Sequence, residues 1–457
     1  MPGANLILPI VLDRRSAAPL SRQLQAGLRD LIVRGGLPAG SLLPPSRRLA
    51  PELGVSRNVV LDAYGQLRHE GLLTARRGQG TRVGSRGGPR PPASRRARWR
   101  LDLHPDVTDL SAFPRRAWGR AVAGALHDLP DQALGYHSAR GIHELRVELA
   151  AYLARTRGVV AEPESIIVCE GLMSAVGLVR EALELKRIAV PRVSYPSLAS
   201  ALQRSGPPIT WLDVDSLGAV FGRLPRGPGR AALVQPAHHY PLGMPMSPER
   251  AETLMRWAAE HGGLILENDA NADVHHDGPG PPALQGRMPD SCLLVGSVSR
   301  VLAPGLRMGW IVAPPALAAM LARYKAITEP GSPVIDQMAF ARFLADGELD
   351  RHLRRLRSSC RRRSKAFSAA LEAELPDCLV TAPSSGFHVT ITLPPGVQEQ
   401  AVIDAAARSG VKLFGLAEHV LNGPPLPPSL VVGYGALPEP SVRRAAGVLR
   451  QAISAAR

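Results

Sequence analysis

The spacing of apolar residues near the start of the chain predicts three short helices. Leucine and isoleucine recur at helical spacing after Pro19, which indicates an amphipathic helix that ends at Gly35–Gly36. A second helix is expected from Pro45–Ser46 to about Leu53. After the turn at 54–56, Ser56 is a suitable N-cap for a third helix. The buried sides of the first and third helices are predicted to consist of Leu20, Leu24, Leu28, Leu31 and Ile32, and of Val60, Ala63, Tyr64 and Leu67.

A short hairpin is expected directly after these helices. The segments 72–75 and 81–83 are strand-like, and the basic, glycine-rich stretch Arg76–Gly80 joins them. Two helices across a tight, glycine-containing turn form a helix-turn-helix candidate. A basic hairpin of this kind can act as a wing that reaches phosphates or the minor groove of DNA. The first part of the chain therefore indicates a nucleic-acid-binding module.

The pattern changes after the hairpin. Residues 85–100 are rich in Gly, Pro and Arg without periodicity, which is typical of a semi-stiff basic linker. From Leu101 onward, short buried-type strands alternate with longer helical segments, which predicts an α/β domain with a mostly parallel central sheet. Ligands of such domains bind beyond the carboxyl ends of the strands. The expected strands are 166–169, 188–190, 231–234, 264–266 and 293–295, with helices at 174–185 and 248–261.

The charge distribution supports this division. The 457 residues carry a formal net charge of +16, and positions 1–100 hold 18 arginines and 5 acidic residues, a net of +13. The remaining residues therefore contribute only about +3. A basic head on a near-neutral body favours an anionic partner such as DNA, although a basic surface that is only solvated gives the same count.

Cysteine spacing and hydropathy restrict the cellular setting. The four cysteines are scattered without C-x-x-C spacing, so neither a disulfide framework nor a zinc motif is expected. The adjacent pairs His238–His239 and His275–His276 do not have the spacing of metal ligands. No signal peptide and no long apolar run is recognisable, so we expect a cytoplasmic protein without a membrane partner.

One stretch of the body carries candidate binding chemistry. Residues 296–310 contain the hydroxyls of Ser297 and Ser299, followed by the guanidinium groups of Arg300 and Arg307. Hydroxyls together with a fixed guanidinium can hold a phosphate. Gly171, which follows a predicted strand and opens a predicted helix, offers backbone N–H groups to the same kind of anion.

The head resembles the GntR-type winged helix along nearly its whole length. The resemblance rests on the strings LPPSRRLA (43–50), LGVSRN (53–58), EGL (70–72) and GQGT (78–81). It implies that the helix-turn-helix and the wing contact double-stranded DNA. Asn58 is then placed to meet a base edge, whereas Val59 stands where the family usually has a Thr. The residues expected at DNA are Arg47, Ser56, Arg57, Asn58, Arg76, Arg77, Gly78, Gln79 and Gly80.

The body resembles the aminotransferase-like domain of MocR-type regulators, which has the fold of type I pyridoxal-phosphate enzymes. The stretch 296–310 is similar to the anchor motif S-x-S-K-x-L-x-P-x-L-R-x-G, and residues 235–246 resemble P-x-H-Q-[FY]-P-x-G-x-x-M. Residues 386–388 and 432–434 match signatures of the smaller subdomain. The resemblance implies a dimeric, often domain-swapped transcription regulator whose body binds pyridoxal phosphate and, in some members, a small-molecule effector.

Together these observations predict the domain limits. We expect a winged helix-turn-helix at 12–84, a linker at 85–100 and an aminotransferase-like domain at 101–457. Within that domain, the large subdomain is expected at about 145–340, and a smaller α+β subdomain at about 345–457.

The sequence departs from the family pattern at the cofactor site. Arg300 stands where the family has the Lys that forms the Schiff base, and an arginine does not release its proton as that chemistry requires. Asn268 replaces the Asp that pairs with the pyridine nitrogen, and Ala270 replaces a Tyr. Asp269 is not expected to substitute, because neighbours on a strand point to opposite faces. The usual carboxylate-binding Arg would fall at Val431. The vestigial or noncovalent cofactor site is expected to consist of Gly171, Tyr195, Asn268, Ser297, Ser299, Arg300 and Arg307.

Three functions stay open at this point. The preferred one is a DNA-binding regulator that has lost the Schiff base, is not an enzyme, and senses a noncovalent ligand or serves dimerisation. The second is a regulator that still binds pyridoxal phosphate noncovalently through Ser297, Ser299 and Arg307. The third is an active aminotransferase, which Arg300, Asn268 and Ala270 disfavour. Arg300 itself is either a buried cation paired with an acid or a clamp for an anionic ligand.

Overall fold

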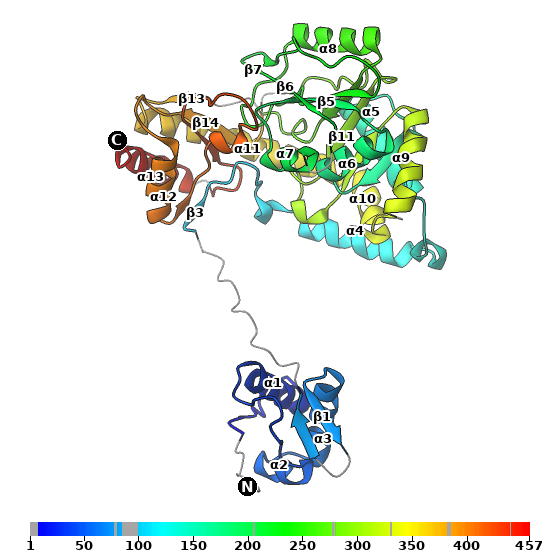
Figure 1. Cartoon of the computed structure of the whole chain (residues 1–457), viewed down its shortest axis with the longest axis vertical. Coiled ribbons are helices and arrows are strands. Elements are labelled where there is room, and N and C mark those ends of the chain that lie inside the picture. Colours follow the sequence, from blue (N-terminus) through cyan, green and yellow to red (C-terminus); the bar gives the residue numbers. More distant parts are fainter. Residues whose placement is uncertain are drawn as a thin grey trace. The chain divides into compact units, whose positions relative to one another are not determined.

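The computed structural model describes residues 8–76, 80–84 and 99–457, apart from 204–205, 277, 279, 330, 382–384 and 439. Contacts divide the chain into two compact units, Met1–Ala97 and Arg98–Arg457. The boundary falls inside the predicted linker, 85–100. Figure 1 shows both units, and each is described by itself below.

The first unit contains three helices and a two-stranded antiparallel sheet (Figure 1). Its core includes all four residues predicted to line the third helix, together with Leu24, Leu28 and Ile32 of the first. Leu73 pairs with Val83 and Arg76 with Gly80, so the predicted hairpin is present. The elements are α1 (Leu20–Val33), α2 (Ser46–Glu52), α3 (Arg57–His69), β1 (Leu73–Arg76) and β2 (Gly80–Val83).

The second unit is built around a seven-stranded sheet in the order β4-β12-β11-β10-β9-β5-β6. Only β12 runs antiparallel to its neighbours, so the predicted mostly parallel α/β sheet is confirmed. The strands are β4 (Ile166–Cys169), β5 (Arg187–Pro191), β6 (Ile209–Leu212), β9 (Arg230–Val234), β10 (Leu264–Asn268), β11 (Cys292–Ser297) and β12 (Gly309–Val312). The helices from the start of the unit to the long helix α11 are α4 (Arg115–Asp128), α5 (His143–Arg157), α6 (Leu172–Ala182), α7 (Pro196–Gln203), α8 (Pro248–His261), α9 (Pro315–Thr328), α10 (Val334–Ala345) and α11 (Glu348–Glu374).

Both faces of this sheet are buried, as its continuous apolar strands require. Along β4, Ile166 and Val168 pack with residues of α4, α5 and α10, whereas Ile167 and Cys169 pack with residues of α6 and α9. This alternation is the period-two geometry of a strand covered by helices on each side. On β9 and β10, one face packs on α8 in the same way. Figure 1 shows these helices on the two sides of the sheet.

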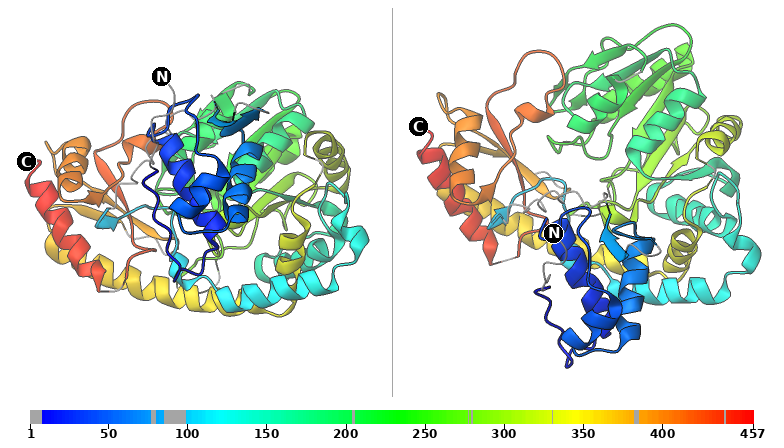
Figure 2. Two further views of the ribbon diagram at one scale, coloured as in Figure 1. Left: turned by 90° about the horizontal axis from the view of Figure 1, so that it is seen from below. Right: turned by 60° about the horizontal axis from the view of Figure 1, so that its bottom comes forward.

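A smaller subdomain completes the second unit. Its sheet has the antiparallel order β13-β14-β16, and a separate parallel pair joins β15 to β3, at the start of the unit. The long helix α11 contacts both α10 and α13, and Figure 2 shows it as the yellow helix running between the two subdomains. The elements not yet named are β3 (Leu101–Asp102), β7 (Val214–Asp215), β8 (Gly218–Ala219), β13 (Leu379–Thr381), β14 (His388–Thr392), α12 (Glu399–Arg408), β15 (Val411–Lys412), β16 (Ser429–Gly433) and α13 (Ser441–Ser454).

The parallel strands end at a common edge, and the candidate binding residues follow that edge. Gly171 comes just after β4, and Tyr195 lies in the loop that leaves β5. Asn268 is the last residue of β10, and Ser297 is the last of β11. Among the described residues, the search for a helix long and apolar enough to span a membrane found none.

Candidate functional site

The exposed start of α3 is the candidate DNA-reading surface. Gly54 has a left-handed φ of 64°, which lets the chain turn tightly between α2 and α3. Ser56 occupies the N-cap position, as expected, but its side chain makes no capping hydrogen bond. Arg57 and Asn58 are exposed, as is Arg47 on α2. Nε of Arg57 donates to Oγ of Ser46 at 3.3 Å, so this arginine links the first turns of α3 and α2.

The wing is described at its two strands. Arg76 and Gly80 face each other as the last pair before the tip. Gly80 has a φ of 79°, and a Cβ placed there would lie 2.9 Å from Cδ1 of Leu42, so this position requires a glycine. The predicted contact residues Arg77, Gly78 and Gln79 lie outside the described residues.

A cluster of small and hydroxylated residues forms where β4 and β11 end. Oγ of Ser297 lies 2.9 Å from Oγ of Ser299 and accepts a hydrogen bond from the Ser299 backbone N–H at 3.0 Å. Gly171 precedes α6 with a φ of 103°, and a Cβ there would lie 3.5 Å from Oγ of Ser297. A Cβ on Gly309 would lie 2.7 Å from the Cα of Gly171, so both glycines are required for this close approach. The start of α6 and the two hydroxyls together suit an anion.

Arg307 stands apart from this cluster in its contacts. Its backbone is left-handed, with a φ of 50°. Its guanidinium is more than half exposed, and Nη2 lies 3.4 Å from Oε2 of Glu170, which is also exposed. An exposed ion pair of this kind contributes little stability, so the guanidinium can turn toward a ligand at low cost.

Arg300 is mostly buried, and an acid holds it. Its Nη1 donates to Oδ1 of Asp106 at 2.6 Å. Burial raises the pKa of Asp106, but the charge and hydrogen bond of Arg300 outweigh that effect, and the pKa is lowered overall. Of the two interpretations of Arg300, the structure therefore shows the buried cation paired with an acid. Arg300 and Arg307 have different acidic partners.

Two aromatic rings lie beside the Arg300 guanidinium. The rings of Tyr195 and Tyr240 stack in parallel, with centroids 4.2 Å apart and an interplanar angle of 5°. The Cζ atom of Arg300 is 5.2 Å from the first centroid and 5.3 Å from the second, which is cation–π distance. Tyr240 thus covers one face of the predicted pocket aromatic, Tyr195.

Buried, neutral histidines surround the rings. His419 Nδ1 lies 3.1 Å from the Gly415 carbonyl, which only accepts, so Nδ1 carries the proton and Nε2 accepts from the Tyr240 hydroxyl at 3.0 Å. His388 donates from Nε2 to the Pro241 carbonyl at 2.6 Å, and burial lowers its pKa to about 4. Within the described part of the chain, no group of three or more His, Cys, Asp or Glu side chains could hold a metal ion.

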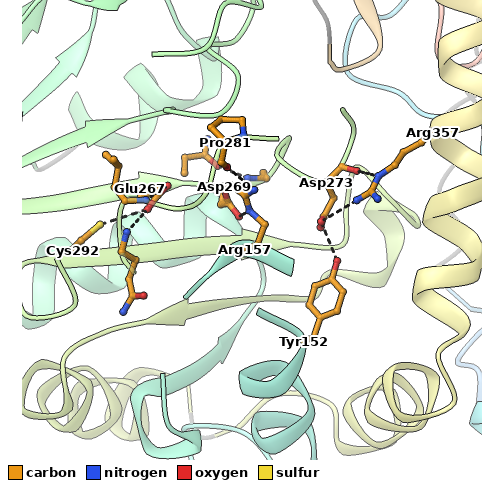
Figure 3. A network of polar contacts seen from close by, with 12 residues as sticks. Tyr152, Arg157, Glu267, Asp269, Asp273, Pro281, Cys292 and Arg357 are labelled. Atoms are coloured by element: carbon orange, nitrogen blue, oxygen red, sulfur yellow. Dashed lines mark hydrogen bonds and ion pairs between the residues drawn. The ribbon is translucent and has the colours of Figure 1, made fainter. Parts of the chain in front are cut away.

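At the end of β10, the neighbouring residues Asn268 and Asp269 have different hydrogen-bond partners. Oδ1 of Asn268 accepts a hydrogen bond from the Ala270 N–H at 3.2 Å. Asp269 instead forms two contacts with Arg157, at 2.9 and 2.8 Å, inside the protein (Figure 3). Asp269 thus points away from Asn268 and is held by Arg157, as expected for neighbouring residues at the end of a strand.

A buried network extends from Asp269 toward α11 (Figure 3). Glu267 accepts hydrogen bonds from two backbone N–H groups at 3.0 Å, and burial raises its pKa to about 7. Asp273 accepts from the Tyr152 hydroxyl at 3.0 Å, and Arg357 donates to the Asp273 carbonyl at 2.6 Å. The contacts of Asp273 join the segment after β10 to α5 and α11.

The residues at position 300 and around it do not fit a covalently held pyridoxal phosphate. The lysines of the chain make contacts away from position 300. Lys325 is buried near Ser332 and Glu329, and Lys412 lies over the Phe414 ring. Lys186 pairs with Glu184, and Lys365 is exposed on α11. An arginine fixed by Asp106 does not supply the neutral amine that a Schiff base needs.

Sequence reasoning missed Asp106 and Tyr240. Asp106 lies 194 positions from Arg300 in the chain, and it falls in a segment without hydrophobic periodicity. Tyr240 stands out in the sequence only as one position of the motif at 235–246. The arginine at position 300 left open a buried pair with an acid, but the sequence did not indicate which acid.

Comparisons with known proteins agree with this architecture. Residues 20–83 match the family described as bacterial regulatory proteins, gntR family, and residues 112–429 match aminotransferase class I and II. A winged helix-turn-helix joined to an aminotransferase-like domain defines a class of DNA-binding transcription regulators.

Whole-length relatives place the chain within that class. It is 31% identical to the HTH-type pyridoxine biosynthesis transcriptional regulator PdxR of Corynebacterium glutamicum, over 98% of this chain and 99% of the relative. It is 29% identical to the probable rhizopine catabolism regulatory protein MocR of Rhizobium meliloti, over 98% and 96%. The chain belongs to the MocR-type subfamily of the GntR transcription regulators.

Solved structures confirm the fold of the second unit. The α-aminoadipate aminotransferase LysN of Thermus thermophilus superposes with a TM-score of 0.70 at 22% identity, covering 78% of this chain and 92% of that one. A multiple substrate aminotransferase of Thermococcus profundus gives the same TM-score, with 78% and 91% coverage. At this identity the likeness concerns the fold.

Proposed function

We propose that this regulator works without a Schiff base to pyridoxal phosphate, and that its aminotransferase-like unit dimerises and senses a noncovalent ligand. The observation that carries the proposal is the Arg300–Asp106 ion pair, since Arg300 stands where the motif that the chain resembles has a lysine. The pair is mostly buried, and removing either partner leaves an uncompensated charge. Catalysis of amino-group transfer is therefore not expected, and we place the protein in the cytoplasm with its operator DNA.

The DNA-binding role is assigned to the exposed start of α3 and to the wing. Arg47, Ser56 and Arg57 serve as phosphate contacts, and Asn58 as a base contact. Arg76, Arg77, Gly78, Gln79 and Gly80 form the wing contacts. Exposure of Arg47, Arg57 and Asn58 supports this assignment. The names of the two relatives suggest control of pyridoxine biosynthesis or of rhizopine catabolism.

An absorbance spectrum with added pyridoxal phosphate, followed by borohydride reduction and intact-mass measurement, tests the proposal. We expect no new band and no mass increase for the wild-type protein. Arg300→Lys alone should give little adduct, because Asp106 stabilises the charged ammonium. Arg300→Lys combined with Asp106→Asn should give more, because that stabilisation is removed. A borohydride-fixed adduct on the wild-type chain would overturn the proposal.

A second candidate is a regulator that holds pyridoxal phosphate noncovalently. The contact between Ser297 and Ser299, next to Gly171, favours it, because this cluster suits a phosphate. Isothermal titration with pyridoxal phosphate should then give a Kd that Arg307→Ala weakens about tenfold. Equal affinity in both proteins, or no binding, would count against this candidate.

A further inference from the structure

The Arg300–Asp106 contact differs from the buried Arg157–Asp269 pair. Arg157 and Asp269 form two parallel contacts, from Nε and Nη2 to both carboxylate oxygens. Arg300 and Asp106 are joined through one guanidinium nitrogen and one oxygen. A single contact is weaker and less specific in geometry than a fork-shaped pair. Asp106 is also more exposed than Asp269, so water reaches it more easily.

Two buried polar atoms beside the rings lack partners among the described residues. Asn271 Nδ2 donates to the Tyr195 hydroxyl at 3.3 Å, while its Oδ1 has none and the residue is 5% exposed. His238 Nδ1 lies 2.6 Å from Oγ of Ser385, while its Nε2 has none and the residue is 2% exposed. If the Asn271 amide were flipped, its other polar atom would lack the partner instead. Buried polar groups are rarely left unpaired without a reason.

These atoms and the guanidinium belong to one neighbourhood. Asn271 holds Tyr195, one of the two rings beside Arg300. The His238 ring packs edge-on against His388, which packs edge-on against Tyr240, the other ring. The group thus combines a cation, two aromatic faces and two unpaired polar atoms.

From this arrangement we infer that the site binds a small carboxylate with a second hydrogen-bonding group, such as an amino or hydroxy acid, in exchange for the Asp106 carboxylate. The inference rests on the proposed function, because a Schiff base would need a different residue at position 300. We expect the ligand to carry a carboxylate because the Asp106 carboxylate already binds the Arg300 guanidinium, and a ligand carboxylate can form the same contact. The second polar group of the ligand would hydrogen-bond to the partnerless atom of Asn271 or His238, and Asp106 forms no such bond.

The exchange would free a segment that leads toward the DNA-binding unit. Asp106 follows β3, which pairs with β15, and Gly433 N–H donates to the Leu103 carbonyl at 2.9 Å. On its other side, Asp109 holds Arg363 of α11 at 2.6 Å. Asp106 thus ties the middle of 104–108 to Arg300, and β3 is the first strand after the predicted linker. Ligand binding would loosen this stretch while both of its ends stay attached.

Competition with a tethered group sets the expected affinities. A side chain held near its partner acts as an internal ligand at an effective concentration on the order of millimolar or more. The wild-type site therefore binds an external carboxylate more weakly than a site without the Asp106 carboxylate. Removing Asp106 should strengthen binding, whereas removing Arg300 should abolish it.

Isothermal titration of the full-length protein, with no pyridoxal phosphate present, tests this with acetate, glycine and glycolate as probes and ethanolamine as a probe without carboxylate. For Asp106→Asn we expect glycine or glycolate to bind at least about tenfold tighter than to the wild type, with acetate weaker than both. Asp350→Asn, which removes an exposed carboxylate paired with Arg155, is the matched control and should behave like the wild type.

The Arg300→Gln, Asp106→Asn double variant separates binding from folding, because it removes both charges and leaves no unpaired one. It should keep its melting temperature near that of the wild type and bind none of the probes. Equal affinity of Asp106→Asn and wild type for every probe, or binding that survives in the double variant, would overturn the inference.

Hydrogen exchange measures the second half of the inference. Amides of 104–108 should exchange several-fold faster in wild-type protein saturated with the tightest probe, with no change in the α5 amides. Binding without faster exchange would overturn the coupling to this segment. Since the cofactor is absent throughout, failure of these titrations leaves the proposed lack of a Schiff base intact, and the borohydride test decides that separately.

Discussion

The buried ion pairs Arg157–Asp269 and Arg300–Asp106 in the second unit join residues that are far apart in sequence. Arg157 on α5 reaches Asp269 just after β10, across 112 positions of the chain. Burial raises the pKa of Asp269, and the charge of Arg157 opposes that effect. The pair resists separation because a lone charge in this interior is costly.

Asp269→Asn should therefore destabilise the second unit strongly. The side chains of Arg157 and Asp269 are only 4% and 6% exposed, so the variant leaves a buried guanidinium without its counter-charge. We expect a loss of about 3–5 kcal/mol in the free energy of unfolding. Urea denaturation followed by circular dichroism measures it.

The control is an exposed pair of the same chemistry. Arg155 and Asp350 are 59% and 36% exposed, so Asp350→Asn should cost less than about 1 kcal/mol. Equal losses in the two variants would contradict the role given to burial.

Buried neutral histidines predict a loss of stability in acid. His388 has its pKa lowered from 6.5 to about 4, mainly by burial. Below pH 6.5 the unfolded chain takes up a proton that the folded chain refuses, so stability is lost as the pH falls from 6.5 toward 4. Each such group changes stability by up to about 1.4 kcal/mol per pH unit in that window.

His388→Gln should reduce this acid sensitivity, because a glutamine amide can donate to the Pro241 carbonyl without titrating. Urea unfolding at pH 7 and pH 5 should show a loss smaller by roughly 2 kcal/mol in the variant than in the wild type. An unchanged pH dependence would mean that this ring is not kept neutral by burial.

Among the elements, helix α3 is an example of a structure that hydrophobic spacing alone predicts. Its buried residues recur at 3.6-residue spacing, so the helix and its core face follow from sequence alone. Its exposed start is fixed by the Gly54 turn and by the contact of Arg57 with Ser46.

Arg57→Ala should weaken binding to the operator and reduce the salt slope by about 1, because it removes a cation that is assigned to a phosphate contact. Gel-shift titrations at several salt concentrations measure both changes. Arg34→Ala is the control, since it also removes one exposed arginine but lies at the end of α1 and pairs with Asp30. Equal weakening in both would show a general charge effect in place of a recognition helix.

For the strands, the hydrophobic pattern predicts their positions in the sequence but not their order in the sheet. Five strands of the large sheet were predicted close to their observed limits, but their spatial order was not. The antiparallel strand β12 pairs with β11, which it follows in the chain, and also with β4, which is distant in sequence. Its placement brings Gly309 against Gly171, which the local sequence gives no reason to expect.

For the whole molecule, the main determinant of DNA affinity is the concentration of positive charge in the first 100 residues. Operator affinity should fall steeply with salt, with a log–log slope of about −0.9 for each phosphate neutralised. Replacing Arg95, Arg96 and Arg98 with Gln should make the slope shallower by up to about 0.9 for each phosphate that these arginines neutralise. Fluorescence anisotropy at several salt concentrations measures it.

Arg354→Gln with Arg355→Gln is the matched control, because these arginines of α11 are exposed but belong to the second unit. The slope should not change. A shallower slope in this control would show that the body also contacts DNA.

The sequence by itself determined the class of the protein, the two-part division with its basic head, and the presence of an arginine at position 300, where the motif it resembles has a lysine. These follow from local periodicity, composition and residue identity, which need no knowledge of distant contacts. Only the tertiary structure decided what holds that arginine. Asp106, Tyr195 and Tyr240 come from segments far apart in the chain, and only the tertiary fold places them around Arg300. A buried guanidinium needs a counter-charge, and local sequence does not say which distant acid supplies it.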